Sequence, residues 1–240
     1  MHDTEAMAQA VTLAASVRVA TSPNPWVGCV IESPEGQVFG GATEPPGGAH
    51  AEVVALRAAG SAARGATVWV TLEPCSHTGR TGPCADALVQ AGVRRVVVAV
   101  EDPDPRVSGR GIERLRAAGI EVEVGVAADV VREQLAPYVQ HRSTGRPWVV
   151  LKLGVSIDGR TAAPDGSSRW ITGGAARADA HQLRAISDAI VVGANTVRLD
   201  DPSLNVRHVD GADPLRVVLG RAAPDAKVQP ALEFEGPLTD

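Results

Sequence analysis

Aromatic residues, cysteines and long apolar runs are all scarce in this chain, and each scarcity argues against a class of protein. Phe, Trp and Tyr together make up 3% of the 240 residues, which leaves few side chains for the stacking surfaces that bind single-stranded nucleic acids. Lysines and arginines form no cluster and the formal net charge is −5, whereas a nucleic-acid site usually needs a basic stripe. We therefore expect no nucleic acid as the main partner.

The chain also lacks the segments that mark membrane and secreted proteins. No stretch approaches the roughly 18 consecutive apolar residues of a membrane-spanning helix. The N-terminal stretch lacks the basic start and apolar run of a secretory signal. The three cysteines are an odd number, which fits free thiols better than a set of disulfides. We expect a cytoplasmic protein with no membrane partner.

What is present is the composition of a folded protein. Hydrophobic residues make up 44% and charged residues 21% of the chain, which is ordinary for globular domains. The length fits one large domain or two modest ones.

Two short motifs carry residues with metal and acid–base chemistry. The first is His50-x-Glu52, and the second is Pro74-Cys75, followed after eight residues by Cys84. One imidazole and two thiolates supply three zinc ligands, which leaves a fourth position open for water. A neighbouring carboxylate can move protons between that water, the attacked ring and the leaving ammonia. This combination is typical of zinc nucleobase deaminases, so we predict His50, Cys75 and Cys84 as zinc ligands and Glu52 as the catalytic residue.

Both motifs are expected at the start of a helix. His50 and Glu52 lie two positions apart and would point to nearly opposite sides of a mid-helix surface. They can converge only in the first turn of the helix predicted over 49–59. Cys84 begins a second predicted helix, at whose N-terminus a thiolate is stabilised. Cys29 lies in a predicted apolar strand and is expected to be a core residue rather than a further metal ligand.

Strands and helices alternate through the first 145 residues. The hydrophobic pattern predicts strands over 27–31, 38–41, 66–72, 95–100 and 120–124. It predicts helices over 4–20, 49–59, 84–92, 111–118 and 128–141, the last broken near Pro137. This alternation predicts a three-layer α/β domain with its site at the ends of the strands.

A polar run at 141–147 is the predicted linker, after which the pattern restarts. Strands are predicted over 148–156, 189–192 and 215–219, with a helix over 174–187. These elements indicate the beginning of a second α/β domain. We expect domains at 1–145 and 146–240.

Taken together, these motifs resemble one family, the bifunctional deaminase–reductases of riboflavin biosynthesis. The resemblance rests on Pro23-Asn24-Pro25, His50-Ala51-Glu52, the segment TLEPCSHTGRTGPC at 71–84, Lys152-Leu153-Gly154, Ser156-Ile157-Asp158-Gly159-Arg160, Trp170-Ile171-Thr172 and Asp200-Asp201-Pro202. The cysteine spacing is its most specific element, because most zinc deaminases have Cys-x-x-Cys instead. Gly82 is a departure, since the family commonly has Pro there.

The resemblance implies two activities in sequence. A cytidine-deaminase-like domain would hydrolyse an amino group of a diaminopyrimidinone that carries a phosphoribosylamino arm, with Zn²⁺ as cofactor. A dihydrofolate-reductase-like domain would then reduce the ribosyl group to ribityl with NADPH. A small phosphorylated pyrimidine is the implied substrate, and a homo-oligomer is expected. The chain ends soon after the strand predicted over 215–219, so the resemblance implies an incomplete reductase domain.

The resemblance also assigns substrate and cofactor residues. Asn24, His77 and Arg80 would contact the deaminase substrate, although Asn24 would equally fit a turn and the other two a solvated loop. In the second domain, Gly154, Trp170, Thr196 and Asp200 would lie near NADPH, and Ser168, Arg184, Leu204 and Arg207 near the phosphorylated substrate. From chemistry alone, Arg184 and Arg207 would pass for surface charges and Trp170 for a core residue.

Two other interpretations of the motifs stay open. One is a deaminase of another nucleobase, a free nucleoside or tRNA, with a degenerate second domain. The other is a non-catalytic binding protein whose fold is held by zinc, which would need a fourth protein ligand to close the site.

Overall fold

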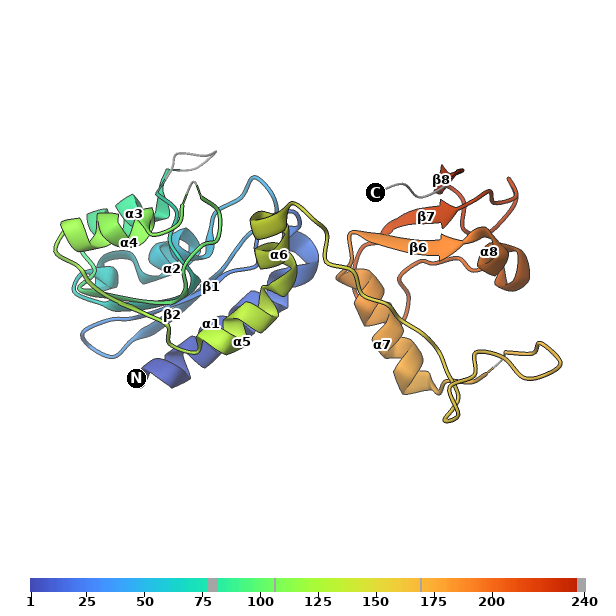
Figure 1. The fold of residues 1–240 in the computed structure, drawn as a ribbon. Helices are drawn as coiled ribbons and strands as arrows, with labels where there is room; N and C mark the ends of the chain where they lie inside the picture. The colour runs from blue at the N-terminus through green and yellow to red at the C-terminus, as the bar shows by residue number, and fades with distance from the viewer. Residues whose placement is uncertain (77–81, 106, 169, 237–240) are drawn as a thin grey trace. The chain divides into compact units, whose positions relative to one another are not determined.

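The computed structural model describes residues 1–76, 82–105, 107–168 and 170–236. The chain divides into two compact units, Met1–Val149 and Val150–Asp240, each built around its own sheet (Figure 1). The boundary that we predicted at 145/146 lies close to this division. Among the described residues, no helix is long and apolar enough to cross a membrane.

The first unit contains a five-stranded sheet in the order β2-β1-β3-β4-β5. Its strands are β1 (Gly28–Glu32), β2 (Val38–Ala42), β3 (Thr67–Leu72), β4 (Arg95–Val100) and β5 (Glu121–Val124). Its α-helices are α1 (Asp3–Thr21), α2 (Ala51–Ala59), α3 (Cys84–Ala91), α4 (Arg110–Ala117), α5 (Ala128–Gln134) and α6 (Ala136–Thr144). β1 runs antiparallel to β2 and β3, whereas β3, β4 and β5 are parallel.

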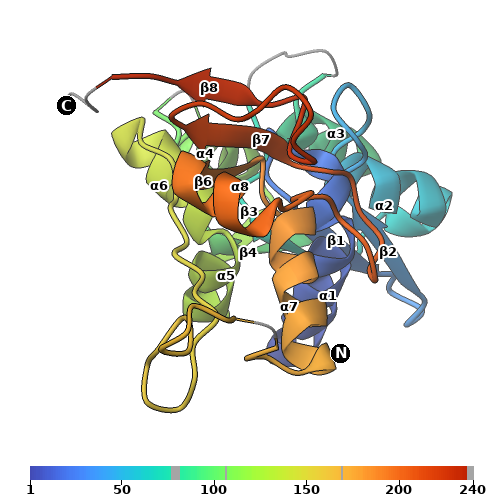
Figure 2. The same ribbon diagram turned by 90° about the vertical axis from the view of Figure 1, so that its right-hand side faces the viewer.

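Helices cover both faces of this sheet, which gives the three layers that the sequence predicted (Figures 1 and 2). Helix α1 packs so closely on β1 that a Cβ on Gly28 would lie 1.9 Å from the carbonyl oxygen of Ala10. Helix α2 packs on β2, where a Cβ on Gly41 would lie 2.3 Å from the carbonyl oxygen of Ala51. Since Gly41 pairs with Cys29, the neighbour of Gly28, and successive residues face opposite sides of a strand, α1 and α2 lie on opposite faces.

The core of the first unit lies between the sheet and these helices. β3 and β4 are almost wholly buried, as expected of parallel central strands. Trp69 on β3 is 1% exposed, and its indole N–H donates to Asp3 Oδ1 at 2.8 Å. Arg95 on β4 donates to both carboxylate oxygens of Asp3, at 2.7 and 2.9 Å. The start of α1 is thereby tied to two central strands.

The second unit has a parallel sheet in the order β6-β7-β8 and a small core. Its elements are α7 (Gly174–Ala185), β6 (Ala189–Gly193), α8 (Ala194–Asp200), β7 (Leu215–Leu219) and β8 (Leu232–Phe234). Residues 150–168 and 170–173, which precede α7, contain neither helix nor strand.

Two local predictions were wrong. The strand expected over 148–156 is irregular, and Leu151 and Leu153 are 81% and 61% exposed. A strand needs a hydrogen-bonded neighbour, and no described strand pairs with this segment. The linker expected over 141–147 begins too early, because α6 continues to Thr144 and ends where Gly145 takes a left-handed conformation, φ 70°.

Candidate active site

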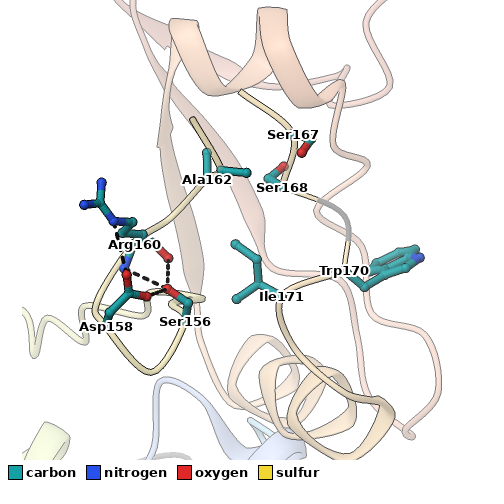
Figure 3. Close-up of a pocket in the computed structure, with 9 residues that line it drawn as sticks. Ser156, Asp158, Arg160, Ala162, Ser167, Ser168, Trp170 and Ile171 are labelled. Carbon is teal, nitrogen blue, oxygen red and sulfur yellow. Dashed lines mark hydrogen bonds and ion pairs between the residues drawn. The ribbon is translucent and has the colours of Figure 1, made fainter. Parts of the chain in front are cut away.

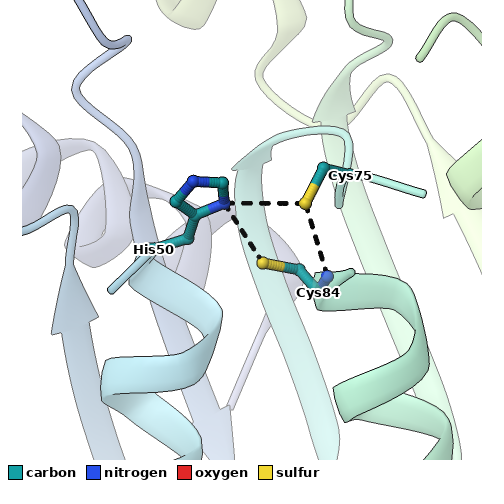
Figure 4. A group of neighbouring side chains, drawn as sticks. All are labelled: His50, Cys75 and Cys84. Atoms are coloured by element: carbon teal, nitrogen blue, oxygen red, sulfur yellow. Dashed lines mark hydrogen bonds between the residues drawn. The ribbon is translucent and has the colours of Figure 1, made fainter. Parts of the chain in front are cut away.

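His50, Cys75 and Cys84 converge in the first unit (Figure 4). His50 Nδ1 lies 3.3 Å from Cys84 Sγ and 3.6 Å from Cys75 Sγ. The potential ligand atoms of the three residues all lie within 4.8 Å of one another. Three donors this close can bind one ion.

The fold brings these residues together from three elements. His50 is the residue that immediately precedes α2, and Cys84 is the first residue of α3. Cys75 follows the end of β3 and is joined to α3 by two hydrogen bonds. The N–H of Ala85 donates to the Cys75 carbonyl at 3.1 Å, and the N–H of Cys84 donates to Cys75 Sγ at 3.4 Å. The N-terminus of α3 therefore stabilises negative charge on the Cys75 sulfur.

The pKa values of the two thiols shift in opposite directions. The hydrogen bond from Cys84 lowers the pKa of Cys75 to about 4, with His50 acting in the same direction. The same bond to Cys75, together with burial, raises the pKa of Cys84. One thiolate forms readily, whereas a second beside it requires a cation. Soft thiolates and an imidazole suit Zn²⁺, so the residues present fit the ion that the motif predicts.

Glu52 lies in the first turn of α2 and is 3% exposed. Burial raises the pKa of Glu52 to about 7, and the charge of Cys75 acts in the same direction. A carboxyl group with such a pKa can both accept and donate a proton near neutral pH. As the spacing predicted, His50 and Glu52 both lie at the start of α2, and the charge of each affects the pKa of the other. Cys29 is completely buried in β1, as expected for a core residue, and burial raises the pKa of its thiol.

Glu73 is a buried acidic residue that the sequence analysis did not single out. It follows β3 and is 4% exposed. Its carboxylate accepts four backbone N–H groups, from Asp102, Gly109, Gly111 and Ile112. The only signal in the sequence was a charged residue directly after an apolar strand, beside Pro74-Cys75.

Of the predicted deaminase substrate residues, only Asn24 belongs to the described part of the chain. It lies in the turn after α1, and its N–H donates to the Thr21 carbonyl at 2.8 Å. That turn leads into β1, and because β1 and β3 are antiparallel, the start of β1 lies at the same sheet edge as the end of β3. His77 and Arg80 lie outside the described residues.

In the second unit, Ser168 and Trp170 line a pocket of about 320 Å³ (Figure 3). On its other side Ser156 donates to Asp158 at 2.5 Å, and Arg160 Nε donates to the same carboxylate at 3.2 Å. Trp170 is 74% exposed, so it is not a core residue. Of the other predicted cofactor residues, Gly154 lies in the irregular segment, and Thr196 and Asp200 lie on α8.

Arg184 and Arg207 meet around a buried histidine, His181 of α7, which the sequence analysis missed. The backbone N–H of Arg207 donates to His181 Nδ1 at 3.1 Å. Arg184 Nη1 lies 3.2 Å from the same nitrogen and donates to the Asn205 carbonyl at 3.3 Å. Leu204 precedes Asn205 with φ 52°, a conformation that is rare for a branched side chain. Ser168, which we predicted near the same phosphorylated substrate, lines the pocket beside Trp170.

A three-layer α/β domain with an imidazole, two thiols and a buried glutamate at paired helix N-termini defines the zinc-dependent deaminase class. In agreement, residues 1–100 match the family model of the cytidine and deoxycytidylate deaminase zinc-binding region. Residues 147–232 match the model of the RibD C-terminal domain.

Known proteins extend this match to nearly the whole chain. The riboflavin biosynthesis protein RibD of Mycobacterium tuberculosis is 50% identical over 232 residues, which are 93% of this chain and 68% of the relative. RibD of Escherichia coli is 50% identical over 86% of this chain, which spans 56% of that relative. The structure of Acinetobacter baumannii RibD superposes with a TM-score of 0.90 at 45% identity and covers 98% of this chain and 74% of its own.

A further solved structure belongs to a protein that is named for two activities. The Thermotoga maritima diaminohydroxyphosphoribosylaminopyrimidine deaminase/5-amino-6-(5-phosphoribosylamino)uracil reductase has a TM-score of 0.90 at 36% identity and covers 96% of this chain and 68% of its own. This chain belongs to the RibD family of riboflavin biosynthesis proteins. The predicted family, fold class, enzyme class and zinc cofactor are thereby confirmed. The match to the RibD C-terminal domain identifies NADPH as the cofactor of that domain's family.

Proposed function

We propose that this chain deaminates 2,5-diamino-6-(5-phosphoribosylamino)pyrimidin-4(3H)-one to 5-amino-6-(5-phosphoribosylamino)uracil. The observation that carries the proposal is the cluster of His50, Cys75 and Cys84 beside a buried Glu52. The activity for which the Thermotoga maritima relative is named supports this substrate. Water replaces the amino group, which leaves as ammonia.

In this mechanism His50, Cys75 and Cys84 would hold Zn²⁺, which would supply a water molecule whose pKa is lowered toward about 7. Glu52 would accept one proton of the attacking water and pass it to the ring nitrogen. A second proton, from the added hydroxyl group, would go to the departing amino group, which leaves as ammonia. The Glu52 pKa of about 7 suits both roles. The deep burial of Glu52 keeps competing water from its carboxylate.

The test is the Glu52→Gln variant, which keeps the shape of the side chain but cannot accept a proton. Ammonia release from the diaminopyrimidinone should fall by about 10²- to 10⁴-fold, the usual effect of losing a general acid–base group. Zinc content should stay near one ion per chain. Glu101→Gln, an exposed site on the loop after β4, is the matched control. Undiminished activity of Glu52→Gln would show that this mechanism is wrong.

We also propose roles for residues that bind the substrate. Asn24, His77 and Arg80 would contact it, with Arg80 taking the phosphate, because guanidinium groups match phosphate oxygens in pairs. The position of Asn24 at the sheet edge that leads to Cys75 supports its part. A small phosphorylated pyrimidine is therefore the favoured partner.

For the second unit we propose a part in the second reaction of the family, the NADPH-dependent reduction of the ribosyl group to ribityl, which the full-length members carry out. Gly154, Trp170, Thr196 and Asp200 would lie near NADPH, and Ser168, Arg184, Leu204 and Arg207 near the phosphorylated substrate. Support comes from the charges of Arg184 and Arg207, which act on one another and on His181, a concentration of positive charge suited to phosphate. NADPH oxidation that depends on the deaminated product would test this activity separately from ammonia release.

We further propose a cytoplasmic homo-oligomer with domains at 1–145 and 146–240. A reducing compartment would keep both cysteine ligands as free thiols; all three cysteines are unpaired. Light scattering during gel filtration would measure the number of chains. The alternatives, another small-molecule or tRNA deaminase and a non-catalytic zinc protein, are disfavoured by family membership. Ammonia release from cytidine or tRNA, with none from the diaminopyrimidinone, would reverse this ranking.

A further inference from the structure

The carboxylate of Glu73 is surrounded by backbone donors. Oε1 accepts the N–H groups of Gly111 at 2.8 Å and Ile112 at 3.2 Å. Oε2 accepts those of Gly109 at 2.9 Å and Asp102 at 3.2 Å. Each oxygen therefore receives two N–H groups at a site that is almost closed to solvent.

Three of these four donors belong to the beginning of α4. The residue that precedes the helix is Gly109, which has no side chain to cap the free N–H groups. Glu73 supplies the missing acceptor from another part of the chain, at the helix end where the dipole favours negative charge. The turn that follows β3 is thereby attached to the N-terminus of α4.

Cys75 lies two residues beyond this attachment. Between them, the Pro74 carbonyl is packed against α4, because a Cβ on Gly111 would lie 1.9 Å from its oxygen. On the other side, Cys75 accepts N–H groups from Ala85 through its carbonyl and from Cys84 through its sulfur. The Cys75 turn is thus held between two helix N-termini, those of α4 and α3.

We propose that Glu73 is a positioning residue for the metal centre: it fixes the turn that places Cys75 Sγ beside His50 and Cys84. Glu73 binds no metal and carries no proton in the reaction. The inference rests on the proposed function in one respect, that His50, Cys75 and Cys84 bind zinc. It adds a contribution from α4, which supplies no proposed ligand.

The experiment compares Glu73→Gln with the wild type in zinc affinity, measured by competition with a chromophoric chelator. The new amide NH₂ would face two backbone N–H groups instead of accepting from them, so the Cys75 turn should lose its fixed position. Zinc affinity should fall about 10- to 100-fold, the usual effect of removing a partner that orients metal ligands. The thiolate charge-transfer and d–d bands of the Co²⁺-substituted protein should shift as well. Glu101→Gln, on the loop that supplies Asp102, should change neither readout.

Gly111→Ala is a second, independent change at the same contact. Its methyl group would push on the Pro74 carbonyl while Glu73 stays intact, so it should give the same two signatures. Should Glu73→Gln fail to fold, this variant decides. The proposal is overturned if the variants lose only the stability of the chelator-treated protein and keep wild-type zinc affinity and Co²⁺ spectrum. A wild type that binds zinc but releases no ammonia would contradict the proposed function alone.

Discussion

At the scale of single residues, the candidate site depends on a conflict that only a cation resolves. Cys75 and Cys84 lie together beside His50, and one thiol donates to the other. Two thiolates in such a place would repel each other unless a cation lay between them. Zinc would relieve the repulsion and join three segments that are distant in sequence. Metal binding should therefore contribute to folding as well as to chemistry.

This reasoning predicts that zinc stabilises the first unit through Cys75. The unfolding midpoint of the wild type should rise when zinc is restored to chelator-treated protein, since an ion at 1,000 times its Kd adds about 4 kcal/mol. Cys75→Ser should lose most of this rise. Cys29→Ala is the control, because this cysteine packs in β1 and its loss should lower the midpoint but keep the zinc response. Differential scanning calorimetry measures the unfolding midpoint of all three proteins with and without zinc. An equal zinc response in Cys75→Ser would contradict the proposed ligand set.

The sequence predicted this site unevenly, for a physical reason. The convergence of His50 and Glu52 follows from helix geometry within three residues, and the motif spacing identified both cysteines. Glu73 could not be found in this way, because its four donors lie 29 to 39 positions further along the chain. Backbone N–H groups carry no mark in a sequence. His181 was missed likewise, since one of its partners is the backbone N–H of Arg207, 26 positions further along the chain.

At the scale of elements, the first unit is held by contacts between ends of helices and central strands. Asp3, in the first turn of α1, connects to β3 through Trp69 and to β4 through Arg95. Periodicity alone predicted α1 and both strands nearly at their observed bounds. It could not predict this connection, because three residues so far apart have no common pattern. The hydrogen bond and charge of Arg95 lower the pKa of Asp3 to about 2, with Trp69 acting in the same direction.

The Asp3 pKa leads to a prediction about acid stability. A carboxyl group whose folded-state pKa lies below its ordinary value of 3.8 stabilises the fold above that value. The contribution is lost as the pH falls from about 4 toward 2. Asp3→Asn should therefore cost about 1 kcal/mol at pH 7, discounted for the partial exposure of the pair. Glu5→Gln removes a charge from the same helical turn without touching Arg95 and serves as the control.

Urea denaturation at several pH values measures this contribution. The difference in the free energy of unfolding between wild type and Asp3→Asn should become smaller as the pH is lowered from 5 to 3. The corresponding difference between wild type and Glu5→Gln should be small at every pH. A difference that is constant over this range would show that the ion pair with Arg95 contributes nothing that depends on pH.

At the scale of the whole molecule, the two units differ in how well their helices and strands could be predicted from the sequence. The first has a large core and a complete five-stranded sheet, and its predicted elements match the observed ones. In the second, β6 and β7 were predicted correctly, but the strand predicted over 148–156 is irregular, because an apolar run becomes a strand only where neighbours pair with it. This chain spans 56% to 68% of the length of the Escherichia coli and Mycobacterium tuberculosis relatives. The proposed zinc ligands and Glu52 all lie in the first unit, so deamination should depend on that unit alone.

Limited proteolysis tests this independence in the intact chain. Lys152 and Arg160 are exposed and lie outside helices and strands, where proteases cleave most readily. Brief trypsin treatment should cut at these sites first and leave a resistant fragment that begins at Met1, identified by mass spectrometry. Since all proposed zinc ligands lie before the cuts, the digest should release ammonia at nearly the undigested rate, while product-dependent NADPH oxidation, if the intact chain supports it, should disappear. First cuts within the five-stranded sheet, or loss of ammonia release with the fragment intact, would contradict an independent deaminase unit.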